Sequence, residues 1–172
     1  MRIFLAASIQ RFPGTDDLLE EISAIRYSKP VRTPELHLTF RFFGDVTPGY
    51  VDELKVTVSR IPFQKFLLKI KGLGAFPSIE KANVLFLEVE NSQQIEENAK
   101  LASLIEPVEK KLRPFVPHIT VSRFNRPVDC TNIRKKYNSL EFQEEIHSLK
   151  IYMSTLTGKI PIYTQLKSIQ LK

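Results

Sequence analysis

Two copies of one short motif contain the residues best suited to chemistry. The chain has three histidines, and two of them precede a threonine by two positions, in His37–Thr39 and His118–Thr120. Imidazole titrates near neutral pH, so one ring can accept a proton while the other donates one. Each threonine hydroxyl can donate a hydrogen bond to a non-bridging phosphate oxygen and stabilise developing charge. The two motifs therefore predict acid–base chemistry on a phosphate group.

Both motifs lie in segments with the alternation of a β-strand, in which every second side chain points to the same face. In HLTFRFF the polar face is expected to hold His37, Thr39, Arg41 and Phe43. The opposite, apolar face is expected to hold Leu38, Phe40 and Phe42. In HITVSRF, alternation places His118, Thr120 and Ser122 opposite Ile119 and Val121. Each motif should therefore present a polar pair that is backed by the hydrophobic core.

The surroundings of the two motifs are also alike. A single histidine beside a threonine on a strand is usually a surface or structural residue, but here each motif follows a proline-containing loop, in KPVRTPELHLTF and LRPFVPHITVSR. This repeated context favours two halves of one site. It predicts two similar α+β lobes, related by an approximate two-fold axis, within one domain that covers residues 1–172.

The rest of the pattern predicts the elements that position the motifs. Apolar and β-branched runs predict strands over residues 2–8, 36–43, 66–71, 83–90, 118–124, 145–155 and 163–171. Periodic apolar positions predict helices over residues 16–27, 47–60, 92–112 and 131–137. Thr15, Thr47 and Ser92 are expected to cap the first three of these helices. Pro107 is expected to kink or interrupt the third helix, and residues 29–34 form a loop.

Composition narrows the class of protein. Of the 172 residues, 42% are hydrophobic and 12 are Phe, which is enough for a folded core. No run approaches the roughly 18 apolar residues of a membrane span, and the single cysteine, Cys130, excludes an internal disulfide and a Cys-rich zinc site. We expect a cytoplasmic protein. The net charge of +6 favours a polyanionic partner such as RNA, although many basic proteins carry such a charge for other reasons.

The segments HLTFRFFG and PHITVSRF resemble the paired His-x-Thr motifs of the two-histidine phosphoesterase superfamily. Within it, the chain resembles the RNA 2′,3′-cyclic phosphodiesterases, also called 2′–5′ RNA ligases. The opening RIFLAASI is similar to that family's first strand, and the ending STLTGKIPIYTQL is similar to its last motif, with Ser154, Leu156, Gly158 and Tyr163 in place. Ile160 and Pro161 depart from the usual Gly-Pro order.

This resemblance implies a bilobal α+β fold in which two antiparallel sheets line a central cleft and helices pack on the outside. It implies hydrolysis of a 2′,3′-cyclic phosphate on RNA, or on a nucleoside, to a 2′-phosphate. By analogy His118 is the general base for water and His37 is the general acid toward the leaving oxygen, although the symmetry permits the reverse order. Thr39 and Thr120 would hold the phosphate. The same chemistry run backward would be 2′–5′ RNA ligation.

Three further residues are candidates for substrate contacts. Arg123 matches the arginine after the family's second motif and would bind phosphate, but simple alternation places it on the core face, so it needs a bulge or a strand end. Arg41 and Phe43 share the face of His37, where Arg41 could meet the phosphate and Phe43 could stack on a base. A solvated arginine and a packed phenylalanine are the alternatives. His147 lacks a threonine two residues on and is interpreted as a surface or structural residue.

The sequence leaves other classes of function open. A non-catalytic RNA- or nucleotide-binding module on the same scaffold is the main alternative, and a metal hydrolase that uses the histidines is a weaker one. We expect no metal and no cofactor. The expected partner is RNA with a 2′,3′-cyclic phosphate end or a small cyclic nucleotide, with no membrane, and the protein is expected to be a monomer.

Overall fold

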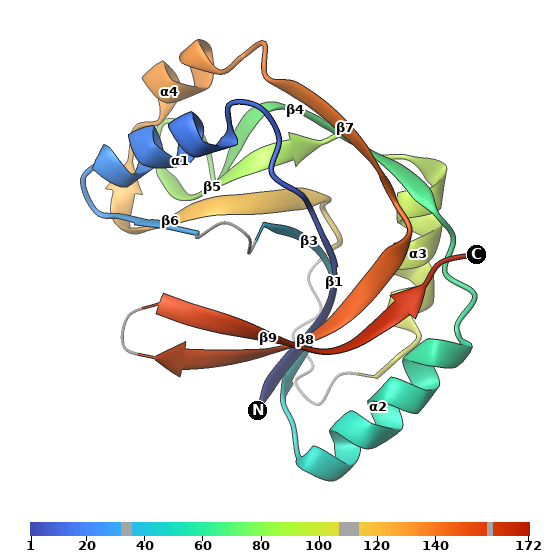
Figure 1. Cartoon of the computed structure of the whole chain (residues 1–172). Helices are drawn as coiled ribbons and strands as arrows, with labels where there is room; N and C mark the ends of the chain where they lie inside the picture. Colours follow the sequence, from blue (N-terminus) through green and yellow to red (C-terminus); the bar gives the residue numbers. More distant parts are fainter. Residues whose placement is uncertain (32–35, 107–113, 158–159) are drawn as a thin grey trace.

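The computed structural model describes residues 1–31, 36–106, 114–157 and 160–172 (Figure 1). These residues form two antiparallel sheets and four helices. The strands are β1 (Arg2–Ser8), β2 (Ser28–Pro30), β3 (His37–Asp45), β4 (Phe66–Phe76), β5 (Ala82–Val89), β6 (His118–Val128), β7 (Glu141–Ile146), β8 (Ser148–Thr157) and β9 (Ile160–Gln170). The helices are α1 (Thr15–Ala24), α2 (Pro48–Arg60), α3 (Gln93–Ser103) and α4 (Thr131–Lys136).

The two sheets share one strand–helix–strand unit. The first has the order β3-β1-β8-β9, and the second has the order β2-β6-β5-β4-β7. Without the short edge strand β2, each sheet begins with a His-x-Thr strand that pairs with an earlier strand, β3 with β1 and β6 with β5. A helix lies between the two strands along the chain in both cases, α1 in the first and α3 in the second, so the predicted similarity of the two lobes is confirmed for this unit. The remaining strands follow in a different chain order. The strands β3 and β6, one from each sheet, are in contact.

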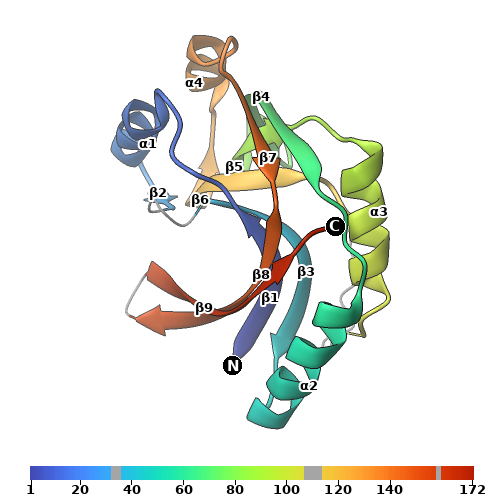
Figure 2. The same ribbon diagram turned by 45° about the vertical axis from the view of Figure 1, so that its right-hand side comes forward.

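The helices lie on the outside of this pair of sheets. Figures 1 and 2 show α1 and α4 near each other on one side of the second sheet, whereas α2 and α3 lie on another side of the molecule. The helix α2 contacts β9, and α3 contacts β3. Buried side chains of both sheets and of α1, α2 and α3 belong to one hydrophobic cluster. In the described part of the chain, no helix is long and apolar enough to cross a membrane.

Two of the predicted helix caps are confirmed. The hydroxyl of Thr47 accepts a hydrogen bond from the backbone N–H of Tyr50, and that of Ser92 accepts one from Ile95. Such caps satisfy an N–H group that the helix itself leaves without a partner. Both helices therefore begin where the sequence indicates.

The cap predicted at Thr15 is wrong. Gly14 precedes α1 in the left-handed conformation, and the Thr15 hydroxyl donates to the carbonyl of Phe12 (2.6 Å). The helix also ends at Ala24, earlier than predicted, and α3 ends at Ser103. The predicted break at Pro107 lies outside the described residues.

Strand boundaries differ from the predictions in several places. Lys29 and Pro30, predicted to lie in a loop, belong to β2, and three strands are longer than predicted: β3, β6 and β9. The glycine-rich segment after residue 71 continues β4 as far as Phe76 and pairs with β5. The single strand predicted over residues 145–155 is instead two strands, β7 and β8, which belong to different sheets and are separated by His147. The polar segment EFQEEI of β7 forms the outer edge of the second sheet, where a strand needs few apolar residues.

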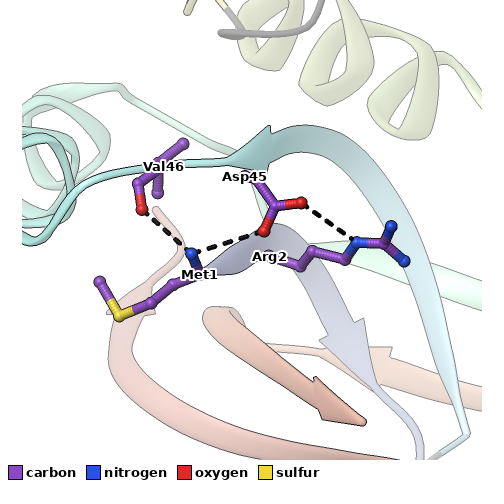
Figure 3. Close-up of polar contacts among 4 residues, drawn as sticks. All are labelled: Met1, Arg2, Asp45 and Val46. Atoms are coloured by element: carbon purple, nitrogen blue, oxygen red, sulfur yellow. Dashed lines mark hydrogen bonds and ion pairs between the residues drawn. The ribbon is translucent and has the colours of Figure 1, made fainter.

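The N-terminus ties β1 to the end of β3 (Figure 3). The amino group of Met1 donates to the carbonyl of Val46 (3.1 Å) and lies 3.5 Å from a carboxylate oxygen of Asp45. The other carboxylate oxygen of Asp45 lies 3.5 Å from Nε of Arg2. These ion pairs are largely exposed, so each contributes at most about 1 kcal/mol. They nevertheless fix the register of the two strands at the far end from His37.

Two bulges interrupt the alternation of β3. Register shifts against β1 leave Phe40 and Phe43 as extra residues of β3. The predicted face for residues 41–43 is therefore wrong. The side chain of Arg41 turns to the core side of the sheet, Phe42 comes to the side of His37, and Phe43 is buried. The exposed fractions are 64% for Phe42 and 0% for Phe43.

This register predicts opposite effects for two neighbouring phenylalanines. Phe43→Ala should lower the free energy of unfolding by about 3–5 kcal/mol, because it removes a fully packed ring. Phe42→Ala should change it by less than about 0.5 kcal/mol. Urea denaturation of the two variants measures both values. Equal losses would contradict the second bulge.

Candidate active site

The imidazole of His118 is held in one orientation by its own loop. Its Nδ1 lies 2.7 Å from the carbonyl oxygen of Val116. A carbonyl can only accept a hydrogen bond, so Nδ1 carries the proton and the neutral ring has its lone pair on Nε2. The rings of Phe76 and Phe86 pack edge-on against the imidazole, with centroids 5.1 and 5.3 Å away. His118 is thus oriented as a proton acceptor through Nε2.

Burial lowers the pKa of His118 below its ordinary value. The hydrogen bond to Val116 acts in the opposite direction, and the positive charge of Arg123 lowers the pKa further. The side chain is therefore neutral at pH 7. A neutral imidazole with an open Nε2 is the form that a general base requires.

A glycine makes room for the aromatic wall beside His118. A Cβ atom at Gly74 would lie 2.5 Å from Cε2 of the Phe86 ring, which is closer than real Cβ contacts. The ring of Phe86 therefore lies flat over β4 because position 74 has no side chain. It packs 4.4 Å from the ring of Phe76, centroid to centroid. The glycine-rich segment of β4 thus shapes the surroundings of His118, a role that the sequence did not reveal.

A bulge in β6 brings Arg123 to the face of His118. Thr120 pairs with Phe86 and Arg123 pairs with Val84, and a register shift between these pairs leaves Val121 as an extra residue. Side chains two residues apart on β5 share a face, so Arg123, Thr120 and His118 share one as well. The bulge that the prediction for Arg123 required is present. The side chain of Arg123 is exposed.

The same irregularity follows both motifs. In β3 the residue directly after Thr39 is the extra one, and in β6 it is the residue directly after Thr120. As a result, the fifth residue after each histidine faces the same way as that histidine. This residue is Phe42 in the first lobe and Arg123 in the second. The two halves of the site therefore offer different chemistry, an aromatic surface and a cation.

His37 lies in an aromatic cluster of the first sheet. The ring centroid of Phe4 lies 5.0 Å from that of His37, and the ring of Tyr163 meets it edge-on at 5.2 Å. Tyr152 lies at 6.4 Å, and its pKa is raised by burial. The ring of Phe4 also contacts Phe42, with centroids 5.8 Å apart. This contact places Phe42 on the side of His37.

The C-terminal motif has a definite position in this cluster. Tyr163 on β9 pairs with Ser154 on β8, and the Tyr163 ring packs against both Phe4 and His37. The motif therefore contributes to the wall around the first histidine. Gly158, which belongs to the same motif, lies outside the described residues.

Arg41 does not belong to the site. Its Nη2 donates to the carbonyl of Ile105, just beyond the end of α3, at 3.2 Å. The hydroxyl of Tyr50 donates to the next carbonyl, that of Glu106, at 2.6 Å. Both side chains thus bind carbonyl groups of the segment that follows α3. The expectation of a phosphate contact through Arg41 fails because the first bulge of β3 directs the side chain away from His37.

Two other predictions can be compared with the structure. Phe43 is fully buried, so it cannot stack on a base. His147 is exposed and lies 3.8 Å from a carboxylate oxygen of Glu145. Among the described residues, no group of three His, Cys, Asp or Glu side chains is placed to hold a metal ion.

Comparison with known proteins gives the family. The family model of the 2′-5′ RNA ligase superfamily matches residues 14–153, and the chain belongs to this superfamily. A relative from Archaeoglobus fulgidus, named RNA 2′,3′-cyclic phosphodiesterase, is 30% identical over 97% of this chain and 98% of its own length. A protein of the same name from Aquifex aeolicus is 29% identical over 88% of this chain and 86% of its own.

Solved structures share the fold. The protein TT0787 of Thermus thermophilus has a TM-score of 0.78 at 24% identity and covers 99% of this chain and 98% of its own. Escherichia coli LigT, crystallised in complex with 3′-AMP, has a TM-score of 0.70 at 22% identity and covers 99% and 97% of the two chains. The arrangement of sheets and helices described above is therefore shared with both proteins.

The electrostatics of His118 can be tested without an assay of activity. NMR titration of the His118 ring should give a pKa below 6.5, the ordinary histidine value. Arg123→Ala should raise this pKa because it removes a nearby positive charge, whereas Arg123→Lys should keep it low. Arg134→Ala, on the outer helix α4, is the charge-matched control. A wild-type pKa at or above 6.5 would contradict the burial described here.

Proposed function

We propose that this protein hydrolyses a 2′,3′-cyclic phosphate at the end of an RNA to a 2′-phosphate, with His118 and His37 as general base and general acid. The observation that carries the proposal is the orientation of His118, whose Nδ1 bonds the carbonyl of Val116 and thereby leaves the lone pair of the neutral ring on Nε2. The relatives named RNA 2′,3′-cyclic phosphodiesterase support the choice of substrate.

The proposed reaction is an in-line displacement at phosphorus. Nε2 of His118 takes a proton from water as the water oxygen attacks the phosphorus atom. The bond from phosphorus to the 3′ oxygen breaks, and His37 donates a proton to that leaving oxygen. The products are a 2′-phosphate and a free 3′ hydroxyl, and exchange with solvent restores both imidazoles. No metal ion is needed, because the two rings supply both proton transfers.

In this proposal three side chains stabilise the negative charge of the phosphate. Thr39 and Thr120 donate hydrogen bonds to its non-bridging oxygens, and Arg123 supplies a positive charge on the same face as His118. The low pKa of His118 supports its assignment as the base, since it is neutral before the reaction. If a 5′ hydroxyl attacked in place of water, the same displacement would join two RNA ends through a 2′–5′ bond.

Phe42 is the proposed platform for the terminal base. Its ring is 64% exposed and is buttressed by Phe4, which itself packs against His37. An exposed ring that is fixed from behind can stack on a nucleobase without a large ordering cost. In this proposal Phe42 takes the role that alternation alone assigned to Phe43.

The catalytic assignment predicts the effect of single histidine substitutions. His37→Ala and His118→Ala should each lower kcat on a 2′,3′-cyclic nucleotide by about 10²-fold or more, because each removes one proton transfer. His147→Ala is the matched control and should keep the wild-type rate. If His37→Ala and His118→Ala both retained that rate, the mechanism would be wrong. Binding of RNA without turnover by the wild type would favour a binding module.

The role of Phe42 predicts an effect on binding. Phe42→Ala should raise KM for a nucleoside 2′,3′-cyclic phosphate by about tenfold, as expected for the loss of one stacked base. Phe42→Trp should keep KM near the wild-type value. Val56→Ala on α2, another exposed apolar position, is the control. A KM unchanged in Phe42→Ala would remove this residue from the proposed site.

A further inference from the structure

The edge of the second sheet carries cationic and aromatic side chains close to Arg123. The strand β2 is the edge strand and pairs antiparallel with β6 (Figure 2). We call this region the β2–β6 edge and define it by six residues: Arg26, Tyr27, Lys29, Arg123, Asn125 and Arg126. Arg26, Lys29, Arg123, Asn125 and Arg126 are exposed, whereas Tyr27 is half-buried.

The register connects this edge to the proposed phosphate site. Lys29 pairs directly with Arg123. Residues directly opposite in an antiparallel pair point to the same face, so Lys29 lies on the face of Arg123 and therefore on that of His118. A second cation thus stands next to Arg123, on its side away from β5. A single small cyclic phosphate bound between the two histidines does not account for this extension.

Tyr27 occupies an unusual backbone conformation at the start of this edge. Its φ is +69°, a left-handed value that bulky side chains seldom adopt. Its carbonyl accepts a hydrogen bond from the N–H of Asn125 (3.2 Å), which holds it beside β6. The guanidinium carbons of Arg26 and Arg126 lie 4.7 and 5.4 Å from its ring centroid. Such an outlier, held in place by its neighbours, is a pointer to function.

The positive charges of this edge are not neutralised by protein groups. None of its four cations, Arg26, Lys29, Arg123 and Arg126, forms an ion pair with a carboxylate of the residues that the structure describes. Other basic side chains behave differently: Lys69 pairs with Glu90, and Lys136 pairs with Glu21. Cations grouped beside an aromatic ring at the surface are the combination that binds single-stranded nucleic acid.

We propose that the β2–β6 edge binds the RNA segment immediately 5′ of the cyclic phosphate. Lys29 takes the first upstream phosphate. Arg126 and Arg26 take the next phosphate, and Tyr27 stacks on an upstream base. Tyr27 lies in the turn directly before β2, two residues before Lys29. This inference rests on the proposed function and adds to it that the preferred substrate is an oligonucleotide and not a mononucleotide.

The test compares two substrates that differ only in length. One is a nucleoside 2′,3′-cyclic phosphate, and the other is a short single-stranded oligonucleotide that ends in the same cyclic nucleotide. We expect Arg126→Ala and Tyr27→Asn to lower the ratio of kcat/KM for the oligonucleotide to kcat/KM for the nucleotide by about tenfold. Asparagine tolerates the left-handed conformation, so Tyr27→Asn removes the ring without adding backbone strain. Lys100→Ala on α3 is the charge-matched control.

A binding measurement separates this proposal from the proposed function. The affinity for an oligonucleotide with a 3′-phosphate end is measured against salt concentration. Arg126→Ala should reduce the magnitude of the log–log slope by about 0.7, the value for one phosphate contact on a single strand. If wild type and variants have the same slope and the same substrate ratio, the β2–β6 edge does not bind RNA. If the wild type turns over neither substrate but the slope still changes, the proposed function fails and the RNA-binding edge stands.

Discussion

The site depends on a one-residue bulge that follows the threonine of each motif. In regular strands Arg123 of β6 and Phe42 of β3 would both point into the core, because successive side chains point to opposite faces. The extra residue, Phe40 in one lobe and Val121 in the other, shifts the pattern by one. The threonine and the fifth residue after the histidine then share a face, while apolar side chains between them still reach the core.

Each lobe contains the same strand–helix–strand unit, but the bulge exposes a different side chain in each lobe. The first lobe places an exposed phenylalanine on the side of His37, within a cluster that includes Phe4 and Tyr163. The second lobe places a cation beside His118, whose pKa is lowered by burial and by that cation. The two histidines of the repeated motif therefore have different chemical surroundings. In the proposed reaction the neutral ring of His118 accepts the proton, Arg123 binds the phosphate, and Phe42 stacks on the nucleobase.

Much of this could be predicted from residue patterns, and the failures have physical causes. The two motifs, most strands and the caps at Thr47 and Ser92 are local features, so the sequence indicates them directly. Alternation misplaces Arg41 and Phe43 because a bulge is set by pairing with β1, which no local pattern reveals. The importance of Gly74 and Lys29 depends on contacts between strands, with Phe86 on β5 and with Arg123 on β6. The sequence shows that Arg123 needs a bulge, but only the strand pairing shows that the bulge is present.

The central claim is that two imidazoles on contacting strands open a cyclic phosphate without a metal. Its most direct test is the product formed from an RNA oligonucleotide with a 2′,3′-cyclic phosphate end, incubated with the protein and an excess of EDTA and analysed by ³¹P NMR. We predict full turnover to a terminal 2′-phosphate. A 3′-phosphate product would contradict the assigned leaving oxygen. Loss of turnover in EDTA that returns with added divalent metal would contradict the mechanism itself.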